Sequence, residues 1–135
     1  MSPQSYRDLQ AWQSAMELAA GVHRLARALP ESEQLVLAND MHRAAIRVVS
    51  NIVDGHSQRE DDLREYRDHL DAARGALAAV ETYMLLVKDL GFAPASRIEP
   101  LEGLAETVRR QVDSLWGSLS IRLHDEPSPF DDPLR

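Results

Sequence analysis

Polar side chains interrupt a stretch of small and apolar residues at 41–58, MHRAAIRVVSNIVDGHSQ. On a helix, with 100° between successive residues, most of these polar side chains fall within about 60° of one another and form one face. This face holds Arg43, Arg47, Ser50 and Asp54. Such a set is consistent with a catalytic site, a nucleic-acid-binding surface, a packing device or the solvated side of a helix, and the last is the commonest arrangement. Asp40 is spaced to pair with Arg43, and Asn51, at the border of the face, is placed for a half-buried amide.

The spacing of the other titratable residues does not predict an enzyme. The chain has five histidines, His23, His42, His56, His69 and His124. None follows an acidic residue by three positions, so the Glu-x-x-His pairs of a di-iron bundle are absent. Glu65 and His69 have the spacing of an acid–base pair on a helix, but the charges around them alternate, which is typical of a solvated face. No phosphate-binding or nucleophile-elbow motif is present. We therefore predict no catalytic activity, no metal site and no cofactor.

Helix signals predict that these side chains lie on a helical bundle. Ala, Leu, Arg and Glu dominate the sequence, and strand signals are nearly absent. The Ser5…Asp8 capping box predicts a first helix over 5–29. A second helix is predicted over 32–55, with Gly55 as its C′ residue.

The third predicted helix carries the clearest packing pattern. A Ser57…Glu60 capping box opens it, and it is predicted to run to Leu90 and to close at Gly91. Apolar residues within it repeat every seven positions in two rows, and this pattern is typical of the seam of a left-handed helix bundle. The rows are Leu63, Leu70, Leu77 and Met84, and Tyr66, Ala73, Val80 and Val87.

The fourth helix is predicted to begin at the capping box of 96–99, with Pro100 in its first turn, and to end near Leu123. Because the connections between the four helices are short, neighbours in sequence are expected to be antiparallel. We therefore predict an all-α protein, an antiparallel up-down-up-down four-helix bundle over 1–123. An acidic, proline-containing tail follows at 124–135.

The first two helices carry more apolar surface than one seam requires. Next to the main stripe of each helix runs a second one, Leu9, Trp12, Met16, Ala19 and Ala26 on the first helix and Leu35, Ala38, Ala45, Val49 and Ile52 on the second. His23 continues an apolar stripe, so we expect it to be satisfied inside a core or an interface. A second stripe indicates a partner subunit, and a wide core face is the alternative. We predict a closed homo-oligomer with helices 1 and 2 in its contacts.

The charge of the chain bears on its partners. The 135 residues have a net charge of −7, and the last twelve, with four acids and one Arg, contribute −3 of it. A negative body argues against binding nucleic acid over the whole surface, because phosphate contacts need clustered cations. A local patch remains as an alternative, formed by Arg43, Arg47, Arg109 and Arg110. With no Cys, no apolar run of about 18 residues and no signal-peptide pattern, we expect a cytoplasmic protein that does not enter a membrane.

Three segments within 6–92 resemble signature segments of a bacterial four-helix-bundle family. They are YRDLQAWQSAMEL, MHRAAIRVVSNIVDG and LDAARGALAAVETYMLLVKDLGF. The family is encoded in intervening sequences of large-subunit ribosomal RNA genes and includes the accessory variability determinant of diversity-generating retroelements. The matching motifs are Arg43-Ala44-Ala45, Ser50-Asn51-Ile52 and Asp54-Gly55, then Ala73-Arg74-Gly75 and Glu81.

This resemblance implies a homopentameric ring of bundles without enzymatic activity. The chain departs from the family pattern at Arg47-Val48-Val49, where Ser-Ile-Pro is usual, and at Ala76, where Ser is usual. The retroelement branch of the family is strongly basic, whereas this chain is acidic. We therefore favour a scaffold with a protein partner, and keep binding of RNA, DNA or a reverse transcriptase as the alternative.

Two charged residues of the third helix flank its seam. Arg74 and Glu81 are seven residues apart, where long side chains cover apolar surface and reach a partner. We predict that they are structural, with Arg43 and Asn51 of the second helix as their candidate partners.

The tail, HDEPSPFDDPLR, contains three prolines, which rule out a regular helix. Phe130 is its only aromatic residue. We predict that Phe130 anchors the tail in an apolar groove, on its own bundle or on an adjacent subunit, while the acids face Arg side chains.

Overall fold

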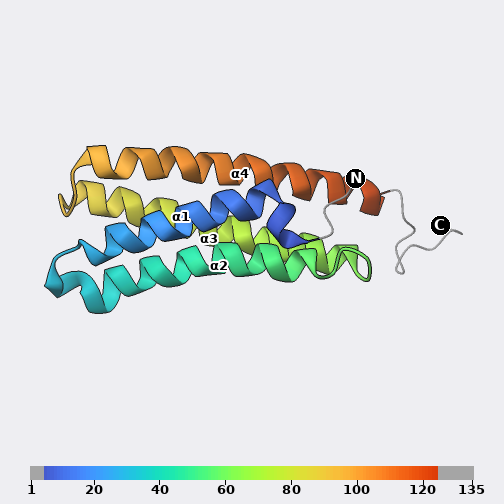
Figure 1. The fold of residues 1–135 in the computed structure, drawn as a ribbon, viewed down its shortest axis with the longest axis horizontal. Helices are drawn as coiled ribbons and strands as arrows, with labels where there is room; N and C mark the ends of the chain where they lie inside the picture. Colours follow the sequence, from blue (N-terminus) through green and yellow to red (C-terminus); the bar gives the residue numbers. More distant parts are fainter. Residues whose placement is uncertain (1–4, 125–135) are drawn as a thin grey trace, which may run out of the picture.

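The computed structural model describes residues 5–124, and over this range the chain folds as a bundle of helices (Figure 1). The long helices are α1 (Gln10–Arg27), α2 (Asn39–His56), α3 (Leu63–Asp89) and α4 (Ala95–His124). Three short segments precede α1 and α2, namely η1 (Tyr6–Asp8), η2 (Glu31–Glu33) and η3 (Gln34–Ala38). The predicted all-α class is confirmed.

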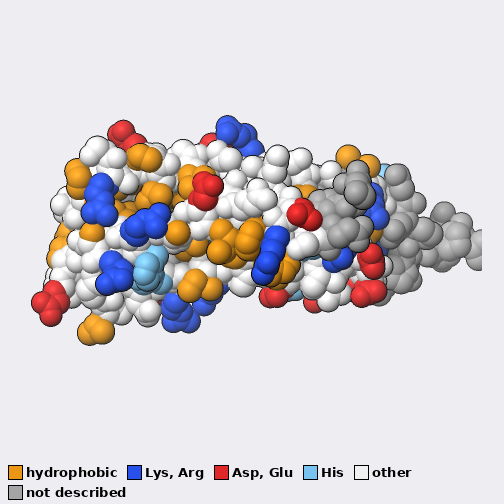
Figure 2. All heavy atoms as spheres, viewed as in Figure 1, with side chains coloured by type: hydrophobic (Ala, Val, Ile, Leu, Met, Phe, Trp, Pro, Cys, Tyr) orange, Lys and Arg blue, Asp and Glu red, His pale blue; other side chains and the backbone are white. Residues whose placement is uncertain are grey.

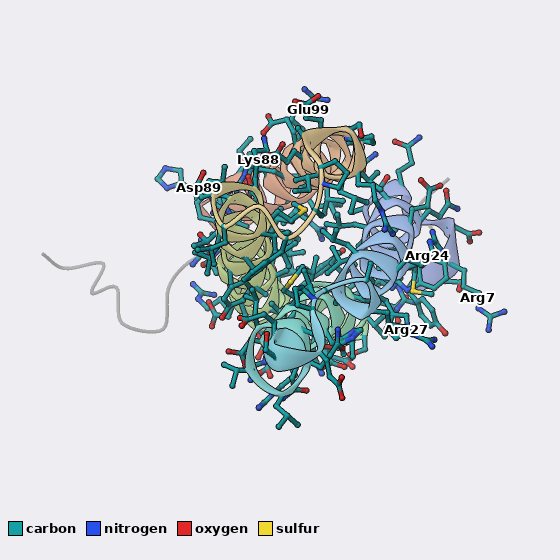
Figure 3. The ribbon with its side chains drawn as sticks, turned by 90° about the vertical axis from the view of Figure 1, so that its left-hand side faces the viewer. Arg7, Arg24, Arg27, Lys88, Asp89 and Glu99 are labelled. Atoms are coloured by element: carbon teal, nitrogen blue, oxygen red, sulfur yellow. The ribbon has the colours of Figure 1, made fainter. Side chains whose placement is uncertain are left out.

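Successive helices run in opposite directions. Along α3 and α4, residue numbers rise on one helix as they fall on the other, because Arg74 contacts Asp113 while Lys88 contacts Glu102. The contacts between α1 and α2, and between α2 and α3, show the same reversal. Viewed end-on, the helices occupy the corners of a square, with α1 opposite α3 and α2 opposite α4 (Figure 3). The arrangement is a four-helix bundle, as predicted.

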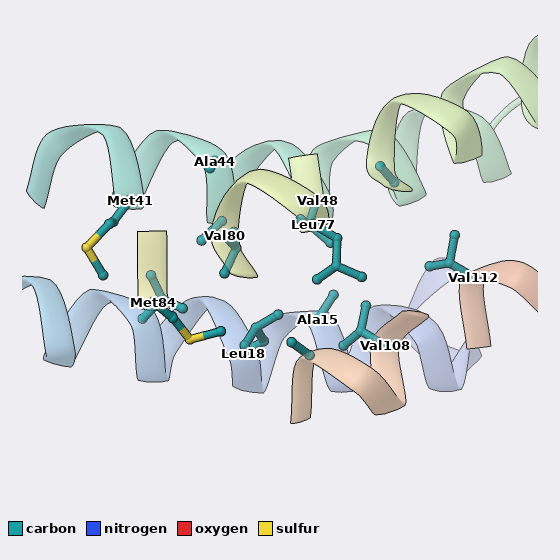
Figure 4. Close-up of a cluster of buried hydrophobic side chains, with 14 of the residues drawn as sticks. Ala15, Leu18, Met41, Ala44, Val48, Leu77, Val80, Met84, Val108 and Val112 are labelled. Atoms are coloured by element: carbon teal, nitrogen blue, oxygen red, sulfur yellow. The ribbon is translucent and has the colours of Figure 1, made fainter. Parts of the chain in front are cut away.

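The core runs along the axis of this square and receives side chains from all four helices. In the close-up, Leu18 from α1, Met41 from α2, Leu77 from α3 and Val108 from α4 point inward (Figure 4). Both predicted rows of α3 are buried, except at Leu63 in its first turn, which is half-buried. The seven-residue repeat of α3 therefore sets the packing of the core, as the pattern predicts.

The first helix begins later than its capping box predicts. Ser5 does cap a helical turn, since its Oγ accepts a hydrogen bond from the backbone N–H of Arg7 at 3.2 Å. That turn is the 3₁₀ segment η1, and Leu9 then adopts an extended conformation with φ −73° and ψ 126°. The predicted start at Ser5 is therefore wrong, because Leu9 turns inward to the core and interrupts the helix before Gln10.

One side-chain amide, that of Gln34, stabilises the connection between α1 and α2. The side chain of Gln34 donates hydrogen bonds to the carbonyls of Ala26, at 3.0 Å, and Leu29, at 2.9 Å. These carbonyls lie at the end of α1, where the helix no longer supplies donors of its own. The chain then enters α2 through the π-helical segment η3, which leaves Leu35 and Val36 exposed.

Gly55 does not end α2, contrary to its predicted role as a C′ residue. It lies inside the helix, is buried, and has no positive φ. A Cβ atom at this position would lie 2.9 Å from the ring of Tyr66 and 3.0 Å from the Cβ of His69. Gly55 therefore allows α2 and α3 to approach closely, which explains the glycine without any special backbone conformation.

The predicted starts of the last two helices are also wrong in detail. Residues 57–61 form turns, so Ser57 opens no helix. Instead the side chain of Asp62 caps α3 by accepting from the N–H of Glu65 at 3.0 Å. In α4, Ser96 lies inside the helix rather than at its cap, and Pro100 is the sixth helical residue. The predicted end of α3 at Gly91 is confirmed, since this residue has φ 70°, which glycine adopts readily.

The second apolar stripes of α1 and α2 lie mostly inside the bundle. Leu9, Ala26, Ala38, Ala45 and Ile52 are buried, and Trp12, Ala19 and Val49 are half-buried against the core. Only Met16, at 44%, and Leu35, at 88%, are clearly exposed. These stripes serve the core of the chain itself, so they give no reason to expect a subunit contact through α1 and α2.

Among the helices of residues 5–124, none has the length and apolar character that a membrane-spanning helix requires.

Because α2 and α3 approach closely at Gly55, we expect the stability of the protein to be sensitive to one added methyl group at this position. We expect Gly55→Ala to lower the free energy of unfolding by about 1–3 kcal/mol, because the added Cβ overpacks the α2–α3 contact. Gly103→Ala, inside α4, is the matched control. A Cβ at Gly103 meets nothing within 4 Å, so the change is expected to be neutral or to stabilise the helix by up to about 1 kcal/mol. Urea denaturation of both variants measures the difference, and equal effects would contradict this explanation of Gly55.

Candidate interaction surface between α2 and α3

A groove of about 440 Å³ runs along the outer side of the α2–α3 contact. Its α3 side is built from small residues, Ala72, Gly75, Ala76 and Ala79, with Tyr83 at one end. These positions follow a spacing of three and four residues, so they lie in one row on the helix. Because none of the four has a side chain larger than a methyl group, the row leaves a depression next to α2. We refer to this depression as the α2–α3 groove.

The α2 side of the groove carries two arginines. Arg43 and Arg47 are exposed and line it, together with Asp40 and Asn51. Neither guanidinium forms an ion pair or hydrogen bond with any of residues 5–124, and the expected pair between Asp40 and Arg43 is not made. The groove therefore offers two unpaired cations and one acid, with an excess of positive charge, beside a floor of small apolar residues.

Asn51 joins the two helices at the end of this groove. Its side-chain Nδ2 donates to the backbone carbonyl of Arg47 at 2.8 Å, and its Oδ1 lies 3.0 Å from Nδ1 of His69 on α3. Because Oδ1 can only accept, we assign the proton to Nδ1 of His69. Asn51 is half-buried, as its position at the border of the polar face predicts.

A second hollow, beyond Asn51, is lined by two acids, Glu65 and Asp68, and by His69. Nε2 of His69 lies 3.7 Å from the carboxylate of Glu65, one turn away on the same helix, and the two side chains are 29% and 55% exposed. The geometry is that of a solvent-exposed polar contact within α3.

Arg74 and Glu81 lie on the other side of α3 and form part of a row of ion pairs with α4. Arg74 pairs with Asp113 at 2.9 Å, and Glu81 pairs with Arg109. The third pair of this row joins Lys88 to Glu102 at 2.7 Å. This hydrogen bond raises the pKa of Lys88. Arg74, Glu81 and Lys88 are seven residues apart, so the row has the same period as the buried seam.

The partners of Arg74 and Glu81 differ from those predicted. Both residues do reach a neighbouring helix, but that helix is α4 and not the α2 of Arg43 and Asn51. Arg74 also lies over the ring of Trp116, with its guanidinium carbon 4.9 Å from a ring centroid. Lys88 was missed, although it continues the seven-residue spacing of the other two. These contacts match a structural role.

The four arginines of the predicted nucleic-acid patch do not form one surface. Arg43 and Arg47 lie on α2, whereas Arg109 and Arg110 lie on α4, at the opposite corner of the square (Figure 3). Arg109 is already engaged by Glu81, and of these two arginines only Arg110 is exposed. The predicted patch is therefore split. Phe130, the predicted tail anchor, lies outside residues 5–124.

His23 of α1 and His42 of α2 form a pair near Arg27. His23 is exposed rather than held in a core, and its Nδ1 lies 2.9 Å from Nδ1 of His42. On this face of the molecule cations and a histidine gather over α1 and α2, toward the end where these helices connect (Figure 2). Burial, followed by the nearby His23 and Arg27, lowers the pKa of His42.

The row of ion pairs predicts an energetic coupling between α3 and α4. In a double-mutant cycle, we expect Glu81→Ala and Arg109→Ala to show a coupling energy of about 0.5–1 kcal/mol, since each side chain is about one-third exposed. Arg110→Ala, at a neighbouring exposed position, is expected to change stability by less than about 0.5 kcal/mol. Additive effects of the two alanine substitutions in urea denaturation would show that the pair contributes nothing.

The lowered pKa of His42 predicts a loss of stability in acid. Unfolded His42 takes up a proton more readily than folded His42, so the free energy of unfolding is expected to fall as the pH drops below about 6.5. We expect His42→Gln to reduce this pH dependence, measured as urea midpoints between about pH 8 and pH 5.5. An NMR titration checks the cause directly, and a His42 pKa at or above its ordinary value would refute it.

Comparison with known proteins supports the resemblance seen in the sequence. The family model described as 23S rRNA-intervening sequence protein matches residues 7–114. This range includes α1, α2, α3 and most of α4, and therefore the whole α2–α3 groove. A search of curated proteins found no match. Because the family model covers most of the chain, the protein belongs to the 23S rRNA-intervening sequence protein family.

Proposed function

We propose that the protein is a non-enzymatic scaffold that acts as a closed homo-oligomer. The observation that carries this proposal is the outer face of α3. From Ala72 to Leu86 its exposed residues are all uncharged, Ala72, Gly75, Ala78, Thr82, Leu85 and Leu86. The charged residues within this range, Arg74 and Glu81, are engaged by α4. About 20 Å of helix surface is thus left without a free charge.

Such a face is unusual for a surface helix of a monomer, where charged residues normally occupy the solvent side. Leu85 and Leu86 are 51% and 42% exposed at its end, and the small residues allow another helix to approach closely. We infer that a second copy covers this face. The family resemblance favours a ring of five copies. The proposal includes a cytoplasmic location, supported by the cysteine-free sequence, and it involves no metal or cofactor.

The assembly can be tested by placing a charge on α3. For the unmodified chain we expect light scattering to give about five times the chain mass of 15.1 kDa. Ala78→Glu is expected to lower that mass, because the exposed Ala78 lies at the centre of the uncharged face. Ala20→Glu is the control, since Ala20 is also exposed, on α1, and both substitutions suit a helix. A monomer at all concentrations would contradict the proposal.

An alternative function is that of an accessory protein that binds nucleic acid or a reverse transcriptase. It is favoured by the free guanidinium groups of Arg43 and Arg47 and disfavoured by the split of the arginine patch. With only two adjacent cations available, we expect weak binding to RNA and DNA, with a salt dependence equivalent to about two phosphate contacts. Fluorescence anisotropy over a salt series measures this. Tight binding that resists salt would reverse the order of the two proposals.

A further inference from the structure

The charges and the apolar floor of the α2–α3 groove indicate the kind of ligand that fits it. Arg43 and Arg47 line it without counter-ions among residues 5–124, whereas Arg74, Lys88 and Arg109 each pair with an acid. The floor beside these two arginines is apolar, and the space above Gly75 is open, since a Cβ there would meet nothing within 4 Å. A ligand that fits both features combines carboxylates with one apolar side chain.

The chain itself contains a segment of this composition. Residues 125–132, DEPSPFDD, hold four acids, no basic residue and a single aromatic one, Phe130. Pro127 and Pro129 favour an extended polyproline conformation, which loses little conformational entropy when it binds along a surface. The two acids that follow Phe130 directly are Asp131 and Asp132, so carboxylates and an apolar side chain occur together.

The length of the tail determines whether it can bind in the groove of its own subunit or only in that of a neighbour. Gly75 follows Arg74, which is level with Asp113, and His124 lies eleven residues further along α4, or about 16 Å. From there the chain must also pass around the outer half of α3, which is roughly 16–19 Å for a helix about 10–12 Å wide, so the diagonal path over the surface is about 23–25 Å. Phe130 is six residues beyond His124 and reaches about 19–21 Å. It falls short of the middle of its own groove.

We propose that the acidic segment 125–132 of one subunit binds in the α2–α3 groove of a neighbouring subunit. Phe130 lies on the floor of alanines and Gly75, and Asp131 and Asp132 face Arg43 and Arg47. The segment then acts as a clasp between copies, next to the uncharged face of α3. This inference rests on the homo-oligomer proposed above and adds the element that links its subunits.

Photo-crosslinking of the full-length protein tests the clasp. The variant Phe130→p-benzoylphenylalanine, irradiated at a concentration where the oligomer is present, is expected to give covalent pairs of about 30 kDa, twice the chain mass. Mass spectrometry is expected to locate the attachment within 43–51 or 72–83 of the second chain. Attachment within the same chain, attachment elsewhere on the neighbour, or no adduct from an intact oligomer would each overturn the clasp.

Charge reversal provides a second, independent readout. We expect Arg43→Glu with Arg47→Glu to lower the crosslink yield at least roughly fivefold, and Asp131→Arg with Asp132→Arg to do the same. Combining the two pairs is expected to restore the yield to within about twofold of the starting protein, because the charges are complementary again.

Arg24→Glu with Arg110→Glu is the matched control, since both arginines are exposed and lie on α1 and α4, away from the groove. We expect no change in yield for this pair, and an equal loss would overturn the proposal. Light scattering of the same samples distinguishes failure of the clasp from failure of the homo-oligomer. A monomer defeats the scaffold proposal and the clasp with it, whereas an oligomer whose crosslinks miss the groove defeats the clasp alone.

Discussion

The side chains of α3 fall into rows with a seven-residue period, and each row makes different contacts. The buried row, which includes Leu70, Leu77 and Met84, builds the core with the other three helices. The charged row of Arg74, Glu81 and Lys88 meets α4. Between Ala72 and Leu86 the exposed positions are uncharged and face solvent or α2. Because the rows share one period, they keep their separate orientations along the whole helix, and the packing of the core fixes the direction of the other two.

The distribution of charge follows from this arrangement. On the α4 side of α3, each charge of the row is already paired with an opposite charge. On the α2 side, Ala72, Gly75, Ala76 and Ala79 provide no acid for Arg43 or Arg47. The same small residues that make the groove therefore also leave its arginines unpaired within residues 5–124. Close contact of α2 and α3 at Gly55 brings both sides of the groove together.

The sequence pattern predicted the fold because burial on a helix has a period that can be read directly. The rows of α3, the closure at Gly91 and the family were all identified from residue types and spacing. Helix starts were predicted less well. Ser-x-x-acid motifs occur at Ser57 and Ser96, but the cap of α3 is Asp62 and α4 begins before Ser96. A capping motif states only that a local hydrogen bond is available, and tertiary packing decides whether a helix begins there.

The partners of polar residues were the least predictable part of the candidate site. A helical wheel gives the direction of Arg74 relative to its own helix, but not which of two neighbouring helices lies in that direction. For the same reason the second stripes of α1 and α2 left a subunit contact and a wide core face as alternatives, and most of their residues lie in the core. Gly55 shows a related limit, because a buried glycine and a C′ glycine look alike in sequence. Each of these cases depends on a distance between helices, which a single helical period does not contain.

The central claim is that a second copy covers the outer face of α3, and hydroxyl-radical footprinting of the full-length protein tests it most directly. Leu85 and Leu86 are 51% and 42% exposed in the single chain, and Met16 on α1 is 44% exposed. At concentrations where the oligomer forms, the account predicts that oxidation of Leu85 and Leu86 falls relative to a dilute sample, while oxidation of Met16 does not change. Equal oxidation of Leu85 and Leu86 at both concentrations, in a sample shown to be oligomeric, would mean that the subunits meet through another surface.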